Sequence, residues 1–192
     1  MEKQYAEDQV FEKISFREKP LAMGEYEACV FRNCDLSDTD LSGRVFIDCE
    51  FSGCNLSMVK LTGTSLQGVR FKECKMLGLH FEQCNQFGIS FSFQQSVLNH
   101  SSFYGVKSKK TKFEQCQLQE VDFTDADFTE SNFYGSDLTN ANFMNTNLEK
   151  ADLQGATNYV LDPERNRIKK AIFSLYEVSG LLAKYDIKIV QK

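Results

Sequence analysis

The stretch Ala126-Asp127-Phe128-Thr129-Glu130-Ser131-Asn132-Phe133-Tyr134-Gly135 states one five-residue pattern twice. A small residue comes first, Asp or Asn second, and Phe third, and the next ten residues continue with Leu138 and Phe143 in the third position. A period of five fits neither the 3.6-residue period of a helix nor the two-residue period of a strand. The stretch therefore predicts a repeat architecture, which decides the fold before any single element is assigned.

The pattern extends far beyond this stretch in both directions. Every fifth residue from Phe11 to Phe91, and again from Leu98 to Leu153, falls on a centre position, and 27 of these 29 positions hold a large apolar side chain. The two exceptions are Gln86 and Ser108. Only 42% of the chain is hydrophobic, so this regularity predicts a core built from one side chain of each repeat.

Cysteines and glycines keep to fixed positions in the same frame. All seven cysteines lie two residues before a centre, and nine of the eleven glycines lie two residues after one. Gly at a recurring corner is expected, because it adopts positive φ at little cost. The cysteines are interpreted as small, reduced, buried side chains and not as metal ligands, because free Cys packs as a hydrophobe and no Cys-x-x-Cys occurs.

These features resemble the pentapeptide-repeat family, whose motif is a small residue, Asp or Asn, Leu or Phe, a polar residue, and often Gly. The resemblance covers roughly residues 10–157 and is clearest at 126–130, 136–140, 141–145 and 151–155. It implies an all-β fold, a right-handed quadrilateral β-helix with four repeats in each 20-residue turn. About seven coils at ~4.8 Å each would give a solenoid ~34 Å long.

Residues 20 positions apart should then stack on one face of the solenoid. Phe11, Phe31, Phe51, Phe71 and Phe91 form such a ladder. The ladder continues as Phe113, Phe133 and Leu153 if two extra residues fall in a register slip at about 92–97. We expect the slip to be a local bulge through which the solenoid continues.

The repeat ends near residue 157, so the chain divides into a solenoid, 1–157, and a C-terminal segment, 158–192. Residues 1–10 are expected to form an N-terminal cap. Residues 159–173 fit a last irregular coil or hairpin, or alternatively a helix from Pro163. Ser174 begins a capping-box pattern, and a short strand is expected at Ile187–Val190. The candidate cap and dimer contacts, at helical spacing, are Leu175, Val178, Leu182 and Tyr185.

No constellation for catalysis, metal binding or a cofactor emerges from the sequence. The two histidines, His80 and His100, have no evident converging partners, and no Gly-rich phosphate loop precedes a helix. A core one side chain thick also leaves little room for a substrate pocket. We therefore expect a binding protein and not an enzyme, with no catalytic residue, no metal and no cofactor.

The net charge of −5 argues against direct nucleic-acid binding, which usually needs a basic surface. No signal peptide or membrane-spanning run is evident, so a cytoplasmic protein without membrane contact is expected.

Residues 113–155 carry a net charge of −8. This acidic end would attract cationic partners, although the motif's own Asp preference and ordinary solubility explain part of it. The candidate partner surface is Glu120, Asp122, Asp125, Asp127, Glu130 and Asp137.

A second candidate surface surrounds the two polar centres. In the predicted register Gln86 and Ser108 are adjacent on one face, beside Lys107, Lys109 and Lys110. Loops on rigid scaffolds often carry binding, so this patch is a candidate partner contact. The alternative is a tolerated insertion with a solvated basic rim.

The C-terminal segment resembles the tail of the Qnr quinolone-resistance proteins. The shared residues are Tyr176-x-x-Ser179-x-Leu181-Leu182 and Ile187-x-Ile189. The resemblance implies a homodimer joined through the tail, and a DNA-like rod that binds DNA gyrase and topoisomerase IV. One insertion stands here where Qnr proteins of Gram-negative bacteria usually carry two loops. The competing hypothesis is an interaction scaffold for another protein partner, without a topoisomerase role.

Overall fold

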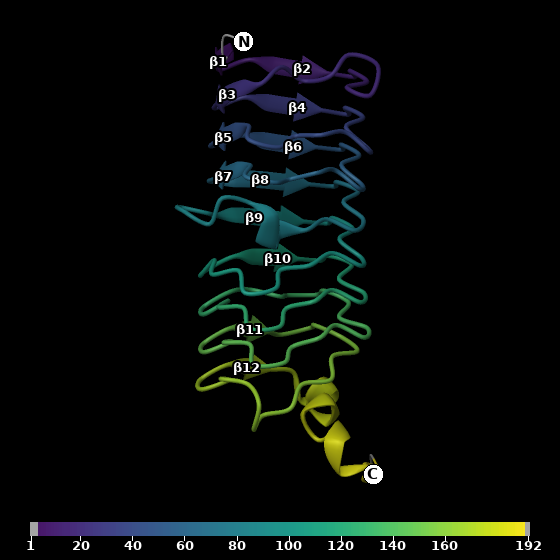
Figure 1. Ribbon diagram of the computed structural model, residues 1–192. Coiled ribbons are helices and arrows are strands. Elements are labelled where there is room, and N and C mark those ends of the chain that lie inside the picture. Colours follow the sequence, from purple (N-terminus) through teal and green to yellow (C-terminus); the bar gives the residue numbers. More distant parts are fainter. Residues whose placement is uncertain (1–3, 191–192) are drawn as a thin grey trace.

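A computed structural model describes residues 4–190 and shows a four-sided β-solenoid of about eight turns, close to the seven expected (Figure 1). The predicted fold class is confirmed. Each side of a turn is only a few residues long, so many rungs are single β-bridges and not full strands. The named elements are β1 (Gln4–Glu7), β2 (Val10–Glu12), β3 (Gly24–Glu27), β4 (Val30–Arg32), β5 (Val45–Ile47), β6 (Glu50–Ser52), β7 (Ser65–Gln67), β8 (Val69–Lys72), η1 (Phe81–Gln83), β9 (Phe91–Gln94), β10 (Lys112–Glu114), β11 (Asp152–Leu153), β12 (Ile172–Phe173), η2 (Leu175–Leu181) and η3 (Ala183–Tyr185).

Parallel pairing between consecutive turns holds the coils together. One face carries the four-stranded sheet β1-β3-β5-β7, and the adjacent face carries the six-stranded sheet β10-β9-β8-β6-β4-β2. The register advances by 20 residues, as in Phe11↔Phe31 and Tyr26↔Phe46. Every turn thus hydrogen-bonds to its neighbours, which is what makes a solenoid stable from local repeats.

The centre side chains point inward and stack in columns along the axis. Phe31 lies on Phe51 with ring centroids 4.5 Å apart and an interplanar angle of 6°. Neighbouring columns meet edge to face, as Phe103 and Phe113 do at 5.5 Å and 87°. Both geometries are favourable for aromatic pairs, so the Phe centres stabilise the interior by stacking and edge-to-face contacts.

The two extra residues lie before β9, so the predicted slip at 92–97 is wrong. Val69 pairs with Phe91 and Phe71 with Phe93, which shifts the register by two residues. Asn85 still donates its backbone N–H to Thr64 O in the ordinary register, so the insertion falls within 86–89. The error arose because Phe91 and Phe93 are both apolar and both buried, and the sequence alone favoured the wrong one.

At the corners of the solenoid the chain turns at residues in the left-handed backbone conformation, with positive φ. Gly43, Gly63 and Gly105 have φ between 65° and 69°, as expected for the glycines that follow a centre by two residues. Many corners use other residues in the same conformation, among them Lys110 and Glu130 at φ 61° and 60°. A side chain at such a corner projects outward, so the corners form rows of polar residues along the rod.

The C-terminal segment differs in part from its prediction. Residues 159–173 form an irregular last coil, in which Arg167 pairs with Asn147 and β12 pairs with β11, and no helix begins at Pro163. The helix after Ser174 is present but is 3-10. Ser174 makes no side-chain cap bond; its hydroxyl accepts from the backbone N–H of Gly155 at 2.8 Å instead. No strand forms at 187–190.

All seven cysteines are buried and free, as the spacing predicted. Burial raises the pKa of the Cys84 and Cys116 thiols to about 12. Several thiols point at backbone carbonyls of the preceding turn, such as Cys49 Sγ to Tyr26 O at 3.2 Å. The buried thiols with raised pKa therefore remain protonated and act as small packing groups.

Candidate functional site

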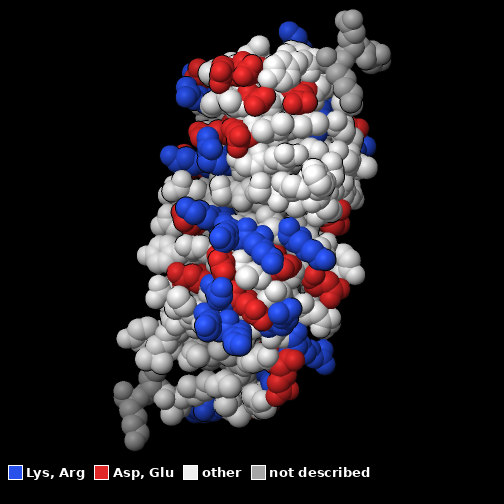
Figure 2. Space-filling model, turned by 90° about the vertical axis from the view of Figure 1, so that its left-hand side faces the viewer, with Lys and Arg blue, Asp and Glu red and all other residues white. Residues whose placement is uncertain are grey.

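The charged face is the side of the rod formed by β1, β3, β5 and β7 and, below them, by the residues that flank the centres Ser108, Phe128, Leu148 and Ile168. The centres point inward and their neighbours outward, as the alternating burial of β3 and β5 shows. Figure 2 shows this side with most of its N-terminal carboxylates grouped near that end and some basic residues along one edge, a mostly uncharged band in the middle, and lysines and arginines interleaved with carboxylates over the C-terminal half.

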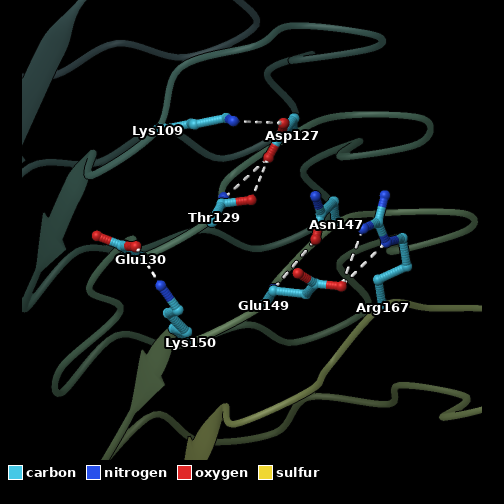
Figure 3. Close-up of polar contacts among 8 residues, drawn as sticks. All are labelled: Lys109, Asp127, Thr129, Glu130, Asn147, Glu149, Lys150 and Arg167. Carbon is cyan, nitrogen blue, oxygen red and sulfur yellow. Dashed lines mark hydrogen bonds and ion pairs between the residues drawn. The ribbon is translucent and has the colours of Figure 1, made fainter.

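The C-terminal half of the charged face is a ladder of opposite charges. Lys109 Nζ lies 3.7 Å from Asp127, and Lys150 Nζ lies 2.8 Å from Glu130 (Figure 3). Arg167 donates to Glu149 Oε1 from both Nε and Nη2, at 3.2 and 2.9 Å. Each pair joins residues 18 or 20 positions apart, because consecutive turns place them one above the other.

These ion pairs partly neutralise the acidic residues that the sequence placed at the C-terminal end of the solenoid. The hydrogen bond from Lys150 and, to a smaller extent, the nearby Lys110 lower the pKa of Glu130, and Lys109 approaches Asp127. The sequence had treated the lysine cluster and the acidic end as two surfaces, whereas the structure interleaves parts of them on one face. Exposed pairs of this kind add little stability, so their main effect is to set the surface charge.

The remaining candidate acidic residues lie on other sides of the rod. Asp122 and Asp137 belong to two further faces, and Glu120 and Asp125 occupy corners. Glu120 also lies 3.2 Å from His100 Nδ1. The six residues therefore do not form one continuous acidic surface, because the chain turns a corner every five residues.

Asp137 is the most strongly held of these carboxylates. Burial raises its pKa, but side-chain hydrogen bonds from Asn158, Gln119 and Thr139 outweigh burial and lower the pKa to about 2. Asp122 and Asp127 each accept from the backbone N–H and hydroxyl of a Thr two residues later. These contacts shape the turn, so the Asp of each repeat has a structural role independent of any partner.

The insertion at 86–89 forms a loop that projects from the charged face (Figure 1). The Gln86 amide donates to Cys84 O at 2.9 Å and to Phe81 O at 3.1 Å, so the polar residue at this centre position braces the loop. Phe87 at the tip is 83% exposed. A fully exposed aromatic on a braced loop is a feature that partner contacts commonly use.

Ser108 does not belong to an exposed patch with Gln86. Its side chain is 3% exposed and its hydroxyl lies 2.9 Å from that of Thr111 inside the solenoid. Lys107, Lys109 and Lys110 are exposed as expected. The loop therefore supplies Gln86 as a brace and Phe87 as the exposed group, while Ser108 is a satisfied core residue.

The candidate tail contacts are largely open to solvent. Leu175 is 81% exposed, Tyr185 is 54% exposed and Leu182 is 37% exposed, while Val178 is half-buried. Leu181 packs against the core instead, and Lys184 ties η3 to Asp162 and Glu164 at 2.8 and 2.7 Å. The tail thus sits across the last coil and presents an apolar outer side.

Sequence reasoning missed Phe87 and the basic residues of the last coil, Arg167, Lys169 and Lys170. Phe87 does not lie on a centre in the repeat frame, so the two-residue slip next to it was the only available signal. The last coil does not keep the five-residue motif, and its bridge between Asn147 and Arg167 becomes visible only in three dimensions.

The surface also has open depressions. One of about 580 Å³ lies between Asn142, Asp162 and Lys184, and another of about 520 Å³ lies between Phe16, Met23 and Arg44, near an Arg17–Asp38 pair at 3.9 Å. In the part of the chain that the structure describes, no three His, Cys, Asp or Glu side chains gather to hold a metal ion. Within residues 4–190 there is also no helix with the length and apolar character needed to cross a membrane.

The sequence matches the family described as pentapeptide repeat region, over residues 25–92 and 79–153. The chain belongs to the pentapeptide-repeat family. No curated protein sequence matches it. Membership accounts for the centre, Asp and corner positions described above, and it leaves the loop and the charged face as features of this particular chain.

Solved structures with similar folds include those of QnrB1, a plasmid-mediated fluoroquinolone resistance protein. One trypsin-treated variant of QnrB1 has a TM-score of 0.73 at 18% identity, covering 98% of this chain and 92% of that one. The full-length form has a TM-score of 0.58 at 21% identity, covering 96% and 100%. At these identities the likeness concerns the fold, which extends over nearly the whole of both chains.

Proposed function

We propose that this pentapeptide-repeat protein is a non-enzymatic binding protein whose rod docks on DNA gyrase or topoisomerase IV. The observation that carries the proposal is the likeness to QnrB1 over 98% of this chain. It is supported by the tail residues around Tyr176 that resemble Qnr proteins, and by the exposed apolar side of the tail. Two copies joined through Leu175 and Leu182 would form a longer rod in the cytoplasm.

The interior of the rod supports a binding role over an enzymatic one. The void between the Leu, Phe and Met side chains of residues 41–81 holds about 10 Å³, which is space for no more than one water molecule. A substrate would therefore have to bind on the outer surface. There, the projecting Phe87 and the exposed Lys107 and Lys109 beside it form a contact for a protein with an apolar hollow and an acidic rim.

The test is binding to purified gyrase at low salt, combined with a supercoiling assay with and without a quinolone. We expect association that weakens as salt rises, protection of supercoiling from the quinolone, and loss of both in Phe87→Ala. The matched control is Phe11→Leu, at a half-buried site on the N-terminal coil away from the loop. Absence of association with gyrase and topoisomerase IV at low salt would rule out this function.

One observation favours the second candidate, a scaffold for a different protein partner. B-DNA carries one negative charge per ~1.7 Å of axis. A protein surface that imitates DNA therefore needs rows of carboxylates that are not neutralised by basic side chains. Here Glu130 and Asp127 are paired with Lys150 and Lys109, which interrupts the row on the charged face. Cross-linking in cells through a photoreactive group at position 87 would identify such a partner, and recovery of gyrase subunits would exclude this alternative.

A further inference from the structure

The charged face has opposite charges at its two ends. On its first three turns the outward residues include five carboxylates and no Lys or Arg: Glu7, Asp8, Glu25, Glu27 and Asp48. On the turns after the loop, the outward residues include seven Lys or Arg and three carboxylates: Lys107, Lys109, Lys110, Lys150, Arg167, Lys169, Lys170, Asp127, Glu130 and Glu149. In Figure 2, Lys and Arg are most numerous on the C-terminal half of this side, where carboxylates lie among them.

Between the charged ends lies an uncharged band that contains a few outward apolar side chains. Val45 and Ile47 are half-exposed on the outer side of β5. The next turn is β7, with Ser65 and Gln67, and the turn after that is replaced by the loop with the exposed Phe87. An exposed aliphatic pair two turns away from an exposed aromatic is an arrangement that an antiparallel second copy could cover.

We propose that the charged face pairs with the charged face of a second copy, antiparallel, about a two-fold axis through β7. A two-fold contact is self-complementary, so whatever lies two turns above the axis meets what lies two turns below it. Lys107 and Lys109 of each copy then face Glu25 and Glu27 of the other, and Phe87 of each copy lies on Val45 and Ile47 of the other.

The projecting loop at 86–89 restricts the position of the two-fold axis. An axis through the loop's own turn would bring the two projecting loops into collision. An axis one turn higher, through β7, places the loops on opposite sides, about two turns or ~9.6 Å apart. Glu130, which then faces the acidic first turn, already has Lys110 and Lys150 as partners, which limits the repulsion.

This pairing is separate from the proposed tail contact. The tail would join rods end to end, whereas the charged face joins them side by side. A narrow, largely charged contact is expected to be weak and reversible, and to depend on salt, because its ion pairs are screened at a Debye length of about 8 Å at physiological ionic strength.

The experiment uses the full chain with Leu175→Ser and Tyr176→Ser, which removes the apolar tail contact and isolates the face. Sedimentation is measured at high protein concentration in low and high salt. We expect dimers at low salt and monomers at high salt. A monomer at low salt in this background would overturn the proposal.

Charge reversal then tests the register. Lys107→Glu with Lys109→Glu should give monomers, and so should Glu25→Lys with Glu27→Lys, because each places like charges opposite one another. Mixed in equal amounts, the two variants should form heterodimers, since both contacts become attractive again. Failure of the mixture to dimerise, with both variants folded by circular dichroism, would overturn the antiparallel register.

Lys60→Glu with Lys75→Glu is the matched control, because it makes the same charge change at exposed positions on two other faces. It should dimerise like the parent. If this control variant also fails to dimerise, the net charge of the protein and not the charged face governs association, and the proposal fails. Gyrase binding is measured in parallel, so the outcome for this contact is independent of the proposed function.

Discussion

The Phe93 ring stacks on the Phe71 ring with centroids 5.3 Å apart, although the two residues are separated by two more positions than any other stacked pair along this column. Phe93 also stacks on Phe113 at 5.2 Å. The aromatic column is therefore continuous through the insertion, and the two extra residues are expelled into the loop at 86–89. Packing in the interior is therefore unbroken on both sides of the loop.

Phe93→Ala should destabilise the protein by about 3–5 kcal/mol, because it leaves a cavity between two stacked rings. Phe87→Ala should change stability by no more than about 0.5 kcal/mol, since that side chain is exposed at the loop tip. Urea unfolding followed by circular dichroism measures both. Equal effects of the two substitutions would contradict the register in which Phe93 is the stacked residue.

Gln86→Ala should loosen the loop without unfolding the rod. The substitution removes the amide that donates to Cys84 O and Phe81 O, and it leaves these carbonyls to water. We expect faster amide hydrogen exchange at residues 86–90 and unchanged exchange in β8 and β9. Gln67→Ala is a control on the neighbouring turn, which contacts the loop but does not brace its backbone.

The sequence predicted the repeat, the faces and the cysteine positions because the centre residues recur every five positions and bury the same kind of side chain. It misplaced the slip because Phe91 and Phe93 satisfy the pattern equally well. It divided the charges wrongly because ion pairs such as Lys150–Glu130 join residues 20 apart on stacked turns. The 3-10 form of η2 depends on how the tail packs on the last coil, and the helical spacing of Leu175, Val178 and Leu182 carries no information about that.

The cysteines should be inert in the folded protein. With the pKa of Cys84 and Cys116 raised to about 12 by burial, only about one thiol in ten thousand is ionised at pH 8. Because all seven thiols are buried, an aromatic disulfide reagent at pH 8 should react with them at the rate of unfolding in native buffer and should label all seven in denaturant. Rapid labelling of one or two thiols in native buffer would contradict this picture.

Asp137 should make stability depend on pH in the acid range. Its folded-state pKa of about 2 lies below its usual value of 3.8, so the ionised form stabilises the fold above pH 4 and this contribution is lost as pH falls towards 2. Asp137→Asn should lower the melting temperature at pH 6 and converge with the parent near pH 2. Asp125→Asn, at an exposed corner, is the matched control and should run parallel to the parent throughout.

At the contact between Tyr159 and the tail, one substitution is expected to raise the stability of the protein. The Tyr159 side chain is 3% exposed, and in the part of the chain that the structure describes its hydroxyl has no hydrogen-bond partner. A buried unpaired hydroxyl costs about 1–3 kcal/mol, so Tyr159→Phe should raise stability, because it keeps the ring against Phe173 and removes the polar atom.

Gly180→Ala, on the other side of the same contact, should lower stability. A methyl group at Gly180 would collide with the backbone oxygen and ring of Tyr159, so η2 would have to move away from the last coil. Thermal unfolding of the two variants, with limited proteolysis after residue 173, measures both effects. A destabilised Tyr159→Phe would show that the hydroxyl has a partner after all, for instance a bound water.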